Sequence, residues 1–335
     1  MGAPRRDRAD PSKVEGLPSL NLNERAWSLV DDAARRAGEL RVHAHTLACG
    51  ARVLDAGIDA PGGLAAGRLL AEVCMGGLGH VDFTPLTIAG EAWPGVQVWT
   101  DHPVESCMAS QYAGWAITPK GYFAMGSGPL RAKARVEKEL YEKLGYIEDA
   151  ARGVLVLETR TLPTDDVAQW VAKRSGLTPD ALTFAVAPTA SLAGGVQVVA
   201  RVVETGLHKM EKLGFDVTRV VSAIGTAPLP PTAKNDLRAI GRTNDCVLYG
   251  GQARYVVDAP DDELAQLAER LPASVSSDYG TPFYEIFKRY DNDFYKIDPL
   301  LFSAGEIWLT STTTGRTFHA GRLNPDVLRA SLYEG

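Results

Sequence analysis

The sequence predicts a mixed α/β (α+β) fold, built as two α/β-type domains with a cleft between them. Its 335 residues exceed what one hydrophobic core usually supports. Strand-like and helix-like patterns alternate without strict βαβ repetition, which favours mixed layers over a closed barrel. One long apolar helix carries a narrow polar stripe, as expected of a helix that lines a cleft. We predict domains over 21–150 and 151–335, preceded by a disordered polar tail over 1–20.

Capping residues and hydrophobic periodicity define the elements of the first half. A helix follows the N-caps Asn21 or Asn23. Alternating apolar and polar residues in 39–47 and 51–57, with a turn between them, predict a β-hairpin. The same criteria predict a buried helix, two strands, a helix, a short strand and an exposed amphipathic helix, in that order: 62–75, 81–89, 96–101, 102–117, 121–126 and 129–145.

The second half repeats the alternation of strand and helix. Apolar runs and caps predict a strand, a helix, a strand and a long helix: 154–158, 165–176, 182–187 and 191–213. The proline-rich segment 227–231 predicts a rigid loop, and Gly250-Gly251 predicts a turn joining two strands within 243–258. A helix over 260–271, an aromatic-rich segment over 278–302 and a final strand pair with a short helix complete the chain.

Composition excludes several classes of function. The net charge of −6, with no Lys/Arg block outside the tail, argues against nucleic-acid binding. No window approaches the roughly 18 apolar residues that a membrane span needs, and the tail lacks the apolar segment of a signal peptide. The four cysteines are scattered and form no CxxC pair, which is typical of a reducing cytoplasm. We therefore expect a cytoplasmic protein.

The helix predicted over 191–213 carries the strongest chemical signal. Its polar residues Gln197, Arg201, Glu204 and His208 follow one another at steps of four, three and four, which places them on one side of the helix. Arg201 and Glu204 lie one turn apart and are close enough to interact. An arginine beside a carboxylate suits activation of a water against a cationic carbon. The alternative is the solvent face of an ordinary amphipathic helix.

Two other motifs have both a functional and a structural interpretation. His43-Ala44-His45 has the spacing by which a strand presents two imidazoles to a metal, but the other four histidines form no second cluster. Solvent-facing histidines are the alternative. The segment 126–129, Gly-Ser-Gly-Pro, precedes a predicted helix, so its amides are suited to hold an anion; a tight turn is the alternative. No GxGxxG motif is present, which argues against a nicotinamide-dependent dehydrogenase.

Seven phrases stand in this order along the chain: LAEVCMGGLG, VWTDHPVESCMASQYAGW, YFAMGSGPLRA, APTASLAGGVQVVARVVETGLHKM, GTAPLPP, GRTNDCVLYGG and DYGTPFYEIFKRYDNDFYKIDP. Together they closely resemble the methenyltetrahydromethanopterin cyclohydrolase family, over residues 20–333. The resemblance implies a hydrolase that interconverts N5,N10-methenyl- and N5-formyl-tetrahydromethanopterin without a metal or redox cofactor. It also implies an active site between two domains and a homo-oligomer, expected to be a trimer.

The resemblance assigns catalytic roles to Arg201 and Glu204, which fall in the family's ARxxE-T phrase. The methenyl carbon of the cationic substrate already accepts nucleophiles, so the site needs a positioned water, a base and an acid. Glu204 can serve as base and then as acid, and Arg201 can hold the carboxylate and the incoming oxygen. We assign substrate binding, by position in the family phrases, to six further residues: Ser127, Gly128, Thr189, Ser191, Gln197 and Asn244.

Two alternative functions stay open. A metal-dependent amidohydrolase or deaminase would use His43 and His45, and a non-catalytic pterin-binding protein would tolerate loss of Glu204. The aromatic residues at 279–295 independently suggest a homo-oligomer, although a buried core within one chain would also explain them. We expect neither nucleic acid nor membrane among the partners.

Overall fold

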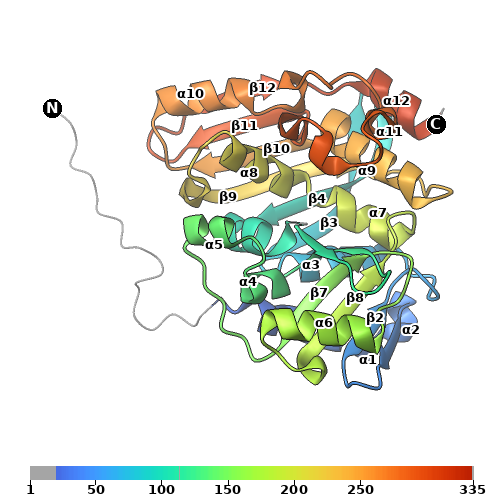
Figure 1. The fold of residues 1–335 in the computed structure, drawn as a ribbon. Coiled ribbons are helices and arrows are strands. Elements are labelled where there is room, and N and C mark those ends of the chain that lie inside the picture. The colour runs from blue at the N-terminus through green and yellow to red at the C-terminus, as the bar shows by residue number, and fades with distance from the viewer. Residues whose placement is uncertain (1–19, 113, 334–335) are drawn as a thin grey trace.

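The computed structural model describes residues 20–112 and 114–333 (Figure 1). The tail predicted over 1–20 therefore lies outside the described residues, except for its last position. Two six-stranded mixed sheets form the framework, one in the lower half and one in the upper half of Figure 1. Neither sheet closes into a barrel. The predicted mixed α/β class is confirmed.

The lower sheet, sheet A, has parallel strands at its centre and antiparallel pairs at its edges. The hairpin predicted near the N-terminus is confirmed and forms one edge. The central strands are continuous apolar runs because helices cover both faces of the sheet. In spatial order the strands are β1 (His43–Thr46), β2 (Arg52–Asp55), β8 (Leu182–Ala187), β7 (Gly153–Glu158), β6 (Ala124–Ser127) and β5 (Trp115–Ile117).

The upper sheet, sheet B, is mainly antiparallel. In spatial order its strands are β12 (Thr317–Gly321), β11 (Glu306–Ser311), β10 (Gln252–Val257), β9 (Val220–Pro228), β4 (Glu91–Thr100) and β3 (Gly79–Ile88). Only β10 and β11 pair in parallel. Each sheet contains strands that come before residue 150 in the sequence and strands that come after it. The domain boundary predicted at residue 150 stays a prediction.

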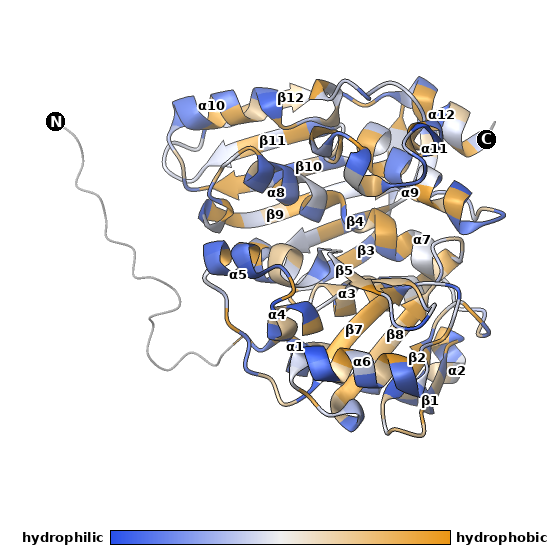
Figure 2. Ribbon diagram, in the orientation of Figure 1, coloured by the Kyte–Doolittle hydropathy of each residue, from blue (hydrophilic) through white to orange (hydrophobic). Residues whose placement is uncertain are grey.

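Helices cover sheet A on both faces. The helices α1 (Leu22–Arg35), α3 (Leu64–Cys74) and α7 (Leu192–Val199) pack on one face, and α6 (Asp165–Ser175) packs on the other. On sheet B, α8 (Val202–Lys212) and α9 (Asp236–Gly250) pack on one face. Figure 2 shows the resulting contrast between the apolar strands β7 and β8 and the polar positions of α6.

Shorter elements complete the chain. They are α2 (Ala37–Leu40), a π-helix (Val104–Gln111), α4 (Leu130–Ala134), α5 (Lys138–Leu144), α10 (Asp261–Arg270), α11 (Phe283–Arg289), α12 (Pro325–Tyr333) and five 3₁₀ turns at Pro179–Ala181, Val217–Arg219, Ala273–Val275, Phe294–Lys296 and Pro299–Leu301. In the described ranges 20–112 and 114–333, no helix is long and apolar enough to cross a membrane.

The single helix predicted over 191–213 is wrong, because two helices, α7 and α8, occupy this segment. They are separated at Ala200 and Arg201, where the Arg201 amide donates to the carbonyl of Val198 at 3.1 Å. This contact spans three residues instead of the four of an α-helix. The apolar pattern continues through the break, so periodicity gives no sign of it.

Three further predicted elements differ in the structure. The helix predicted over 102–117 is wrong, because a π-helix ends at Gln111 and Trp115–Ile117 form the strand β5. The helix predicted over 129–145 is divided into α4 and α5, and Arg135 between them has a left-handed backbone, with φ of 49°. The strand pair predicted over 243–258 is wrong, because most of its first half belongs to α9. Asn235 caps this helix by accepting from the amide of Arg238 at 3.0 Å. Burial of one helix face outweighs the strand preference of its β-branched and aromatic residues.

The face of sheet B opposite α8 and α9 carries a row of side chains that crosses all six strands. We call it the outer row, and strand register places its members side by side in this order: His80, Trp99, Ile224, Arg254, Trp308 and His319. Trp308 lies between Arg254, at 3.8 Å, and His319, with ring centroids 4.8 Å apart. Most of these residues are exposed, as Ile224 is to 38%.

Asn23 joins α1 to the central strand β7 and to Pro129 and Glu148 through three buried hydrogen bonds of its side chain. Its Nδ2 donates to the carbonyl of Pro129 at 2.9 Å and to Glu148 Oε1 at 3.0 Å. Its Oδ1 accepts from the amide of Val154 at 3.0 Å. The side chain is fully buried, so each of these groups would otherwise be unsatisfied away from water.

We predict that Asn23→Ala lowers the free energy of unfolding by about 2–4 kcal/mol, because it leaves buried donors and an acceptor without partners. Urea unfolding followed by circular dichroism measures this difference. Ser28→Ala, at an exposed position of the same helix, is the matched control and should change stability by no more than about 0.5 kcal/mol. Equal effects of the two substitutions would contradict the prediction.

Candidate active site

The break between α7 and α8 faces the end of the π-helix. Gln111, the last residue of the π-helix, donates from Nε2 to the carbonyl of Ala200 at 3.1 Å. In return, Arg201 Nη1 donates to the carbonyl of Gln111 at 2.5 Å. Carbonyls at helix ends lack partners within their own helix, so this exchange satisfies both ends. Single π-helical turns of this kind occur frequently at functional sites.

The guanidinium of Arg201 is held entirely by neutral acceptors. Besides the Gln111 carbonyl, its Nη2 donates to Gln197 Oε1 at 2.9 Å and to Ser127 Oγ at 3.1 Å. The residue is only 8% exposed. Among the residues that the structure describes, no carboxylate lies within ion-pair distance of it. Its positive charge is therefore fixed in place without being neutralised.

Glu204 lies in the first turn of α8 and is 4% exposed. In the described part of the chain, no group donates a hydrogen bond to its carboxylate, and the expected direct contact with Arg201 is not formed. Burial raises the pKa of Glu204 to about 7, although the positive charges of Arg201 and Arg131 oppose the rise. The carboxyl is therefore poised to gain or lose a proton near neutral pH.

Sequence reasoning missed Arg131, which it placed on an exposed helix. The side chain is fully buried beneath the site, and its Nη1 donates to the carbonyl of Ser110 at 3.2 Å. Its Nη2 pairs with Glu137 at 2.7 Å, and the guanidinium lies 4.9 Å from the ring centre of Tyr112. The sequence feature that could have indicated a role for Arg131 is its position just after the Gly-Ser-Gly-Pro turn, at the start of α4.

The predicted binding residues Ser127 and Gln197 lie at the site, where both accept hydrogen bonds from Arg201. Ser127 Oγ also lies 2.9 Å from the thiol of Cys74. Gly128 follows with φ of +99°, a conformation that favours glycine, and its amide donates to the carbonyl of Ser110 at 2.8 Å. Because that amide is already used, Gly128 serves here as a turn residue.

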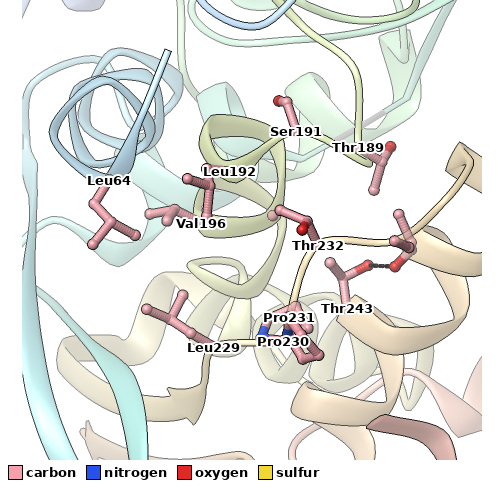
Figure 3. A pocket seen from close by; sticks show the side chains of 13 residues that line it. Leu64, Thr189, Ser191, Leu192, Val196, Leu229, Pro230, Pro231, Thr232 and Thr243 are labelled. Atoms are coloured by element: carbon pink, nitrogen blue, oxygen red, sulfur yellow. Dashed lines mark hydrogen bonds between the residues drawn. The ribbon is translucent and has the colours of Figure 1, made fainter. Parts of the chain in front are cut away.

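Thr189 and Ser191 line a neighbouring pocket between α7 and α9 (Figure 3). Ser191 caps α7 by accepting from the amide of Gly194 at 3.0 Å. The opposite wall of the pocket includes the loop 229–233 and Thr243 of α9. Asn244, predicted for this wall, is not among the lining residues, and its Nδ2 donates to the carbonyl of Ile240 within α9, at 2.8 Å.

Glu158 is a second carboxylate that sequence reasoning missed. It ends β7, and its Oε1 accepts a hydrogen bond from the hydroxyl of Thr189. Burial raises the pKa of Glu158, while the Thr189 bond and the charge of Arg201 oppose this rise. Glu158 thus lies within the electrostatic reach of Arg201 and beside the pocket of Figure 3. The only sequence feature that could have indicated Glu158 is the presence of a carboxylate at the end of an apolar strand.

The last residue of the predicted polar stripe, His208, lies one turn beyond Glu204 on α8. Its ring stacks on Tyr112 with centroids 4.9 Å apart. Burial lowers the pKa of His208 to about 4, so the imidazole is neutral at pH 7. The predicted stripe is therefore mostly buried, and it does not form a solvent face.

His43 and His45 lie on the β1–β2 hairpin with ring centroids 5.4 Å apart. Within residues 20–112 and 114–333, no group of three or more His, Cys, Asp or Glu side chains is arranged to hold a metal ion. The ligand geometry thus offers no support for the alternative metal-dependent amidohydrolase.

We predict that the Glu204 carboxyl titrates near pH 7, and that Arg201→Met moves its pKa higher because a stabilising positive charge is lost. Difference infrared spectroscopy of the carboxyl band across pH 5–9 measures both values. The band should disappear in Glu204→Gln, which identifies it. A band titrating near the ordinary glutamate pKa of about 4.3 would contradict the prediction.

Comparison with known proteins gives a consistent result. The family model described as "Cyclohydrolase (MCH)" matches residues 21–332. A methenyltetrahydromethanopterin cyclohydrolase of Methylobacterium organophilum is 47% identical over 326 residues, which cover 96% of this chain and 99% of that protein. The enzyme of the same name from Methylobacillus flagellatus is 46% identical, with 96% and 98% covered.

A third relative of the same name, from Methanococcoides burtonii, is 39% identical over 314 residues, with 93% of this chain and 98% of that protein covered. The match includes nearly every described residue. The resemblance inferred from the seven phrases is confirmed. This chain belongs to the methenyltetrahydromethanopterin cyclohydrolase family.

Proposed function

We propose that this protein is a hydrolase of one-carbon metabolism that interconverts N5,N10-methenyl-tetrahydromethanopterin and N5-formyl-tetrahydromethanopterin. The shared name of its relatives supports the substrate. The observation that carries the reaction class is a buried carboxyl, Glu204, with a pKa of about 7, one turn from the buried Arg201. A group with such a pKa exchanges protons efficiently at neutral pH.

In the proposed reaction a water oxygen bonds to the methenyl carbon, and the Glu204 carboxylate accepts one proton of that water. The adduct is neutral, because the proton that leaves the water carries the positive charge to Glu204. Glu204 then returns its proton to N10 while the bond between the carbon and N10 breaks. The remaining hydroxyl loses its proton to solvent and becomes the formyl oxygen on N5. Water and the cation thus give the formyl product and one released proton.

Arg201 has a positioning and electrostatic role in this proposal. A guanidinium held only by neutral acceptors keeps its charge free to attract the incoming oxygen as that oxygen becomes more negative. The same charge repels the cationic substrate, and the carboxylates of Glu204 and Glu158 offset this repulsion. We propose no metal or redox cofactor, because the substrate carbon is already electrophilic.

We predict that Glu204→Gln retains substrate binding but lowers turnover by about a hundred- to ten-thousand-fold, the usual contribution of a general acid–base group. The wild-type hydrolysis rate should rise as the pH increases through about 7, since the base form must be ionised, and this dependence should vanish in the variant. Loss of methenyl absorbance measures turnover, and fluorescence titration measures binding.

Arg201→Lys is the companion variant. Lysine keeps the positive charge but lacks the planar guanidinium that bonds several acceptors at once. The variant should therefore position the charge less well and retain partial activity. A Glu204→Gln protein with wild-type turnover would remove Glu204 from the reaction. A wild-type protein that binds the methenyl compound without hydrolysing it would instead support the pterin carrier.

We also propose a homo-oligomer, expected to be a trimer, with the outer row of sheet B as its contact surface. A row that combines two half-buried tryptophans with an exposed isoleucine has the apolar, aromatic composition of interface cores. Light scattering at micromolar concentration should give a multiple of the 36.0 kDa chain mass. Trp308→Glu should shift the protein towards monomer, whereas Glu269→Gln on exposed α10 should not. A monomeric wild type would contradict this proposal.

A further inference from the structure

The π-helix ends with four consecutive carbonyls, each of which accepts a hydrogen bond from a side chain outside the helix. Carbonyls in the last turn of a helix lack an amide partner within it, so such outside donors fix their direction. In chain order, the carbonyls of Met108, Ala109, Ser110 and Gln111 accept from Arg131 Nη1 at 3.5 Å, Tyr141 Oη at 2.8 Å, Arg131 Nη1 at 3.2 Å and Arg201 Nη1 at 2.5 Å. Three side chains that are distant in the sequence therefore hold the end of the π-helix.

Two of these side chains, Arg131 and Tyr141, are not part of the proposed reaction, and we call them the carbonyl clamp. Both are buried, Arg131 completely and Tyr141 with 2% exposure. Glu137, the N-cap residue of α5, pairs with Arg131 Nη2 at 2.7 Å and so holds the guanidinium against the helix end. In the described ranges, Tyr141 donates no hydrogen bond to Arg201 or Glu204. Its effect on these two residues has to pass through the π-helix.

Gln111 connects the clamped helix end to Arg201. Its carbonyl directly follows the three clamped carbonyls and accepts from Arg201, while its Nε2 donates to the carbonyl of Ala200. The aligned peptide dipoles make the C-terminal end of a helix partly negative, which favours a cation there. Since no carboxylate of the described residues pairs with Arg201, this helix end is a principal determinant of where the guanidinium lies. A displaced helix end would displace the charge that acts on Glu204.

We propose that the carbonyl clamp positions Arg201 for the reaction without touching the substrate. Arg131 and Tyr141 fix the direction of carbonyls 108–110, and the rigid helix end then presents the Gln111 carbonyl to Arg201. A displacement of about 1 Å in an orienting group can slow a reaction about a hundred-fold. The inference rests on the proposed function for the reaction that Arg201 supports.

Steady-state hydrolysis of the methenyl compound tests the positioning role. Tyr141→Phe removes only the hydroxyl that bonds the Ala109 carbonyl and should lower kcat about three- to ten-fold, the effect of one hydrogen bond. Arg131→Met removes two carbonyl contacts and should lower kcat about a hundred-fold. Arg131→Lys restores the charge and a donor and should recover part of this loss. KM should stay within about three-fold of wild type in each variant, because the clamp is buried away from the substrate.

A double-mutant cycle separates positioning of Arg201 from a general weakening of the fold. Arg201→Lys lacks the guanidinium that bonds the Gln111 carbonyl, so Tyr141→Phe in this background should change kcat by less than about two-fold. Tyr146→Phe is the matched control. Its hydroxyl donates to Glu148 and to no carbonyl of the π-helix, so its loss should leave kcat within about two-fold in both backgrounds.

Infrared titration of the Glu204 carboxyl gives a readout that does not need turnover. The positive charges of Arg201 and Arg131 lower the pKa of this carboxyl. The other ionisable groups that face it are neutral, since burial raises the pKa of each: Cys74, Cys107 and Tyr255. Tyr141→Phe changes no charge, so it should move the titration to higher pH only by letting Arg201 move away. In Arg201→Met protein the same substitution should produce no shift, and Tyr146→Phe should produce none in either background.

Three results would overturn the inference. They are a kcat of Tyr141→Phe within two-fold of wild type, an equal loss of kcat in the wild-type and Arg201→Lys backgrounds, or a Glu204 titration that Tyr141→Phe leaves unchanged or moves to lower pH. If Arg131→Met does not fold, the Tyr141→Phe measurements decide alone. Failure of the wild type to hydrolyse the methenyl compound would refute the proposed function, while the infrared titration would still decide whether the clamp positions Arg201.

Discussion

The exchange of hydrogen bonds between Gln111 and the α7–α8 break organises the centre of this molecule. Gln111 donates to the Ala200 carbonyl, and Arg201 donates to the Gln111 carbonyl, so each helix end supplies the partner that the other lacks. The π-helix belongs to the segment between the two sheets, and α7 and α8 pack towards sheet A and sheet B respectively. One pair of contacts therefore sets both the path of the chain and the position of the guanidinium.

Charge in the site is arranged around Arg201, which no carboxylate of the described residues neutralises by direct contact. Arg201 is held by carbonyl, amide and hydroxyl oxygens, while Glu204 and Glu158 lie within the reach of its field without being bonded to it. Burial raises the pKa of Glu204, and the field of Arg201 and Arg131 keeps the rise moderate. A direct ion pair would have kept Glu204 ionised and unsuited to exchanging a proton at neutral pH.

The two sheets contribute different parts of the site. Sheet A places Ser127 and Glu158 at the ends of neighbouring strands, and Thr189 in the loop that follows a third strand. The helix α9 of sheet B supplies the facing wall of the pocket, including Thr243. Groups from distant parts of the chain thus meet where loops leave two rigid layers, which is the usual location of functional residues.

The sequence by itself determined the mixed class, the hairpin and most strand positions, and it indicated the candidate residues Arg201, Glu204, Gln197 and Ser127. These follow from local patterns and from long family phrases. Tertiary structure alone decided that α7 and α8 are separate, that 236–250 is helical, and that Arg131 and Glu158 are near the site. The reason is that helix breaks and burial of charge depend on partners such as Gln111 and Thr189, which lie far away in the sequence and leave no periodic signal.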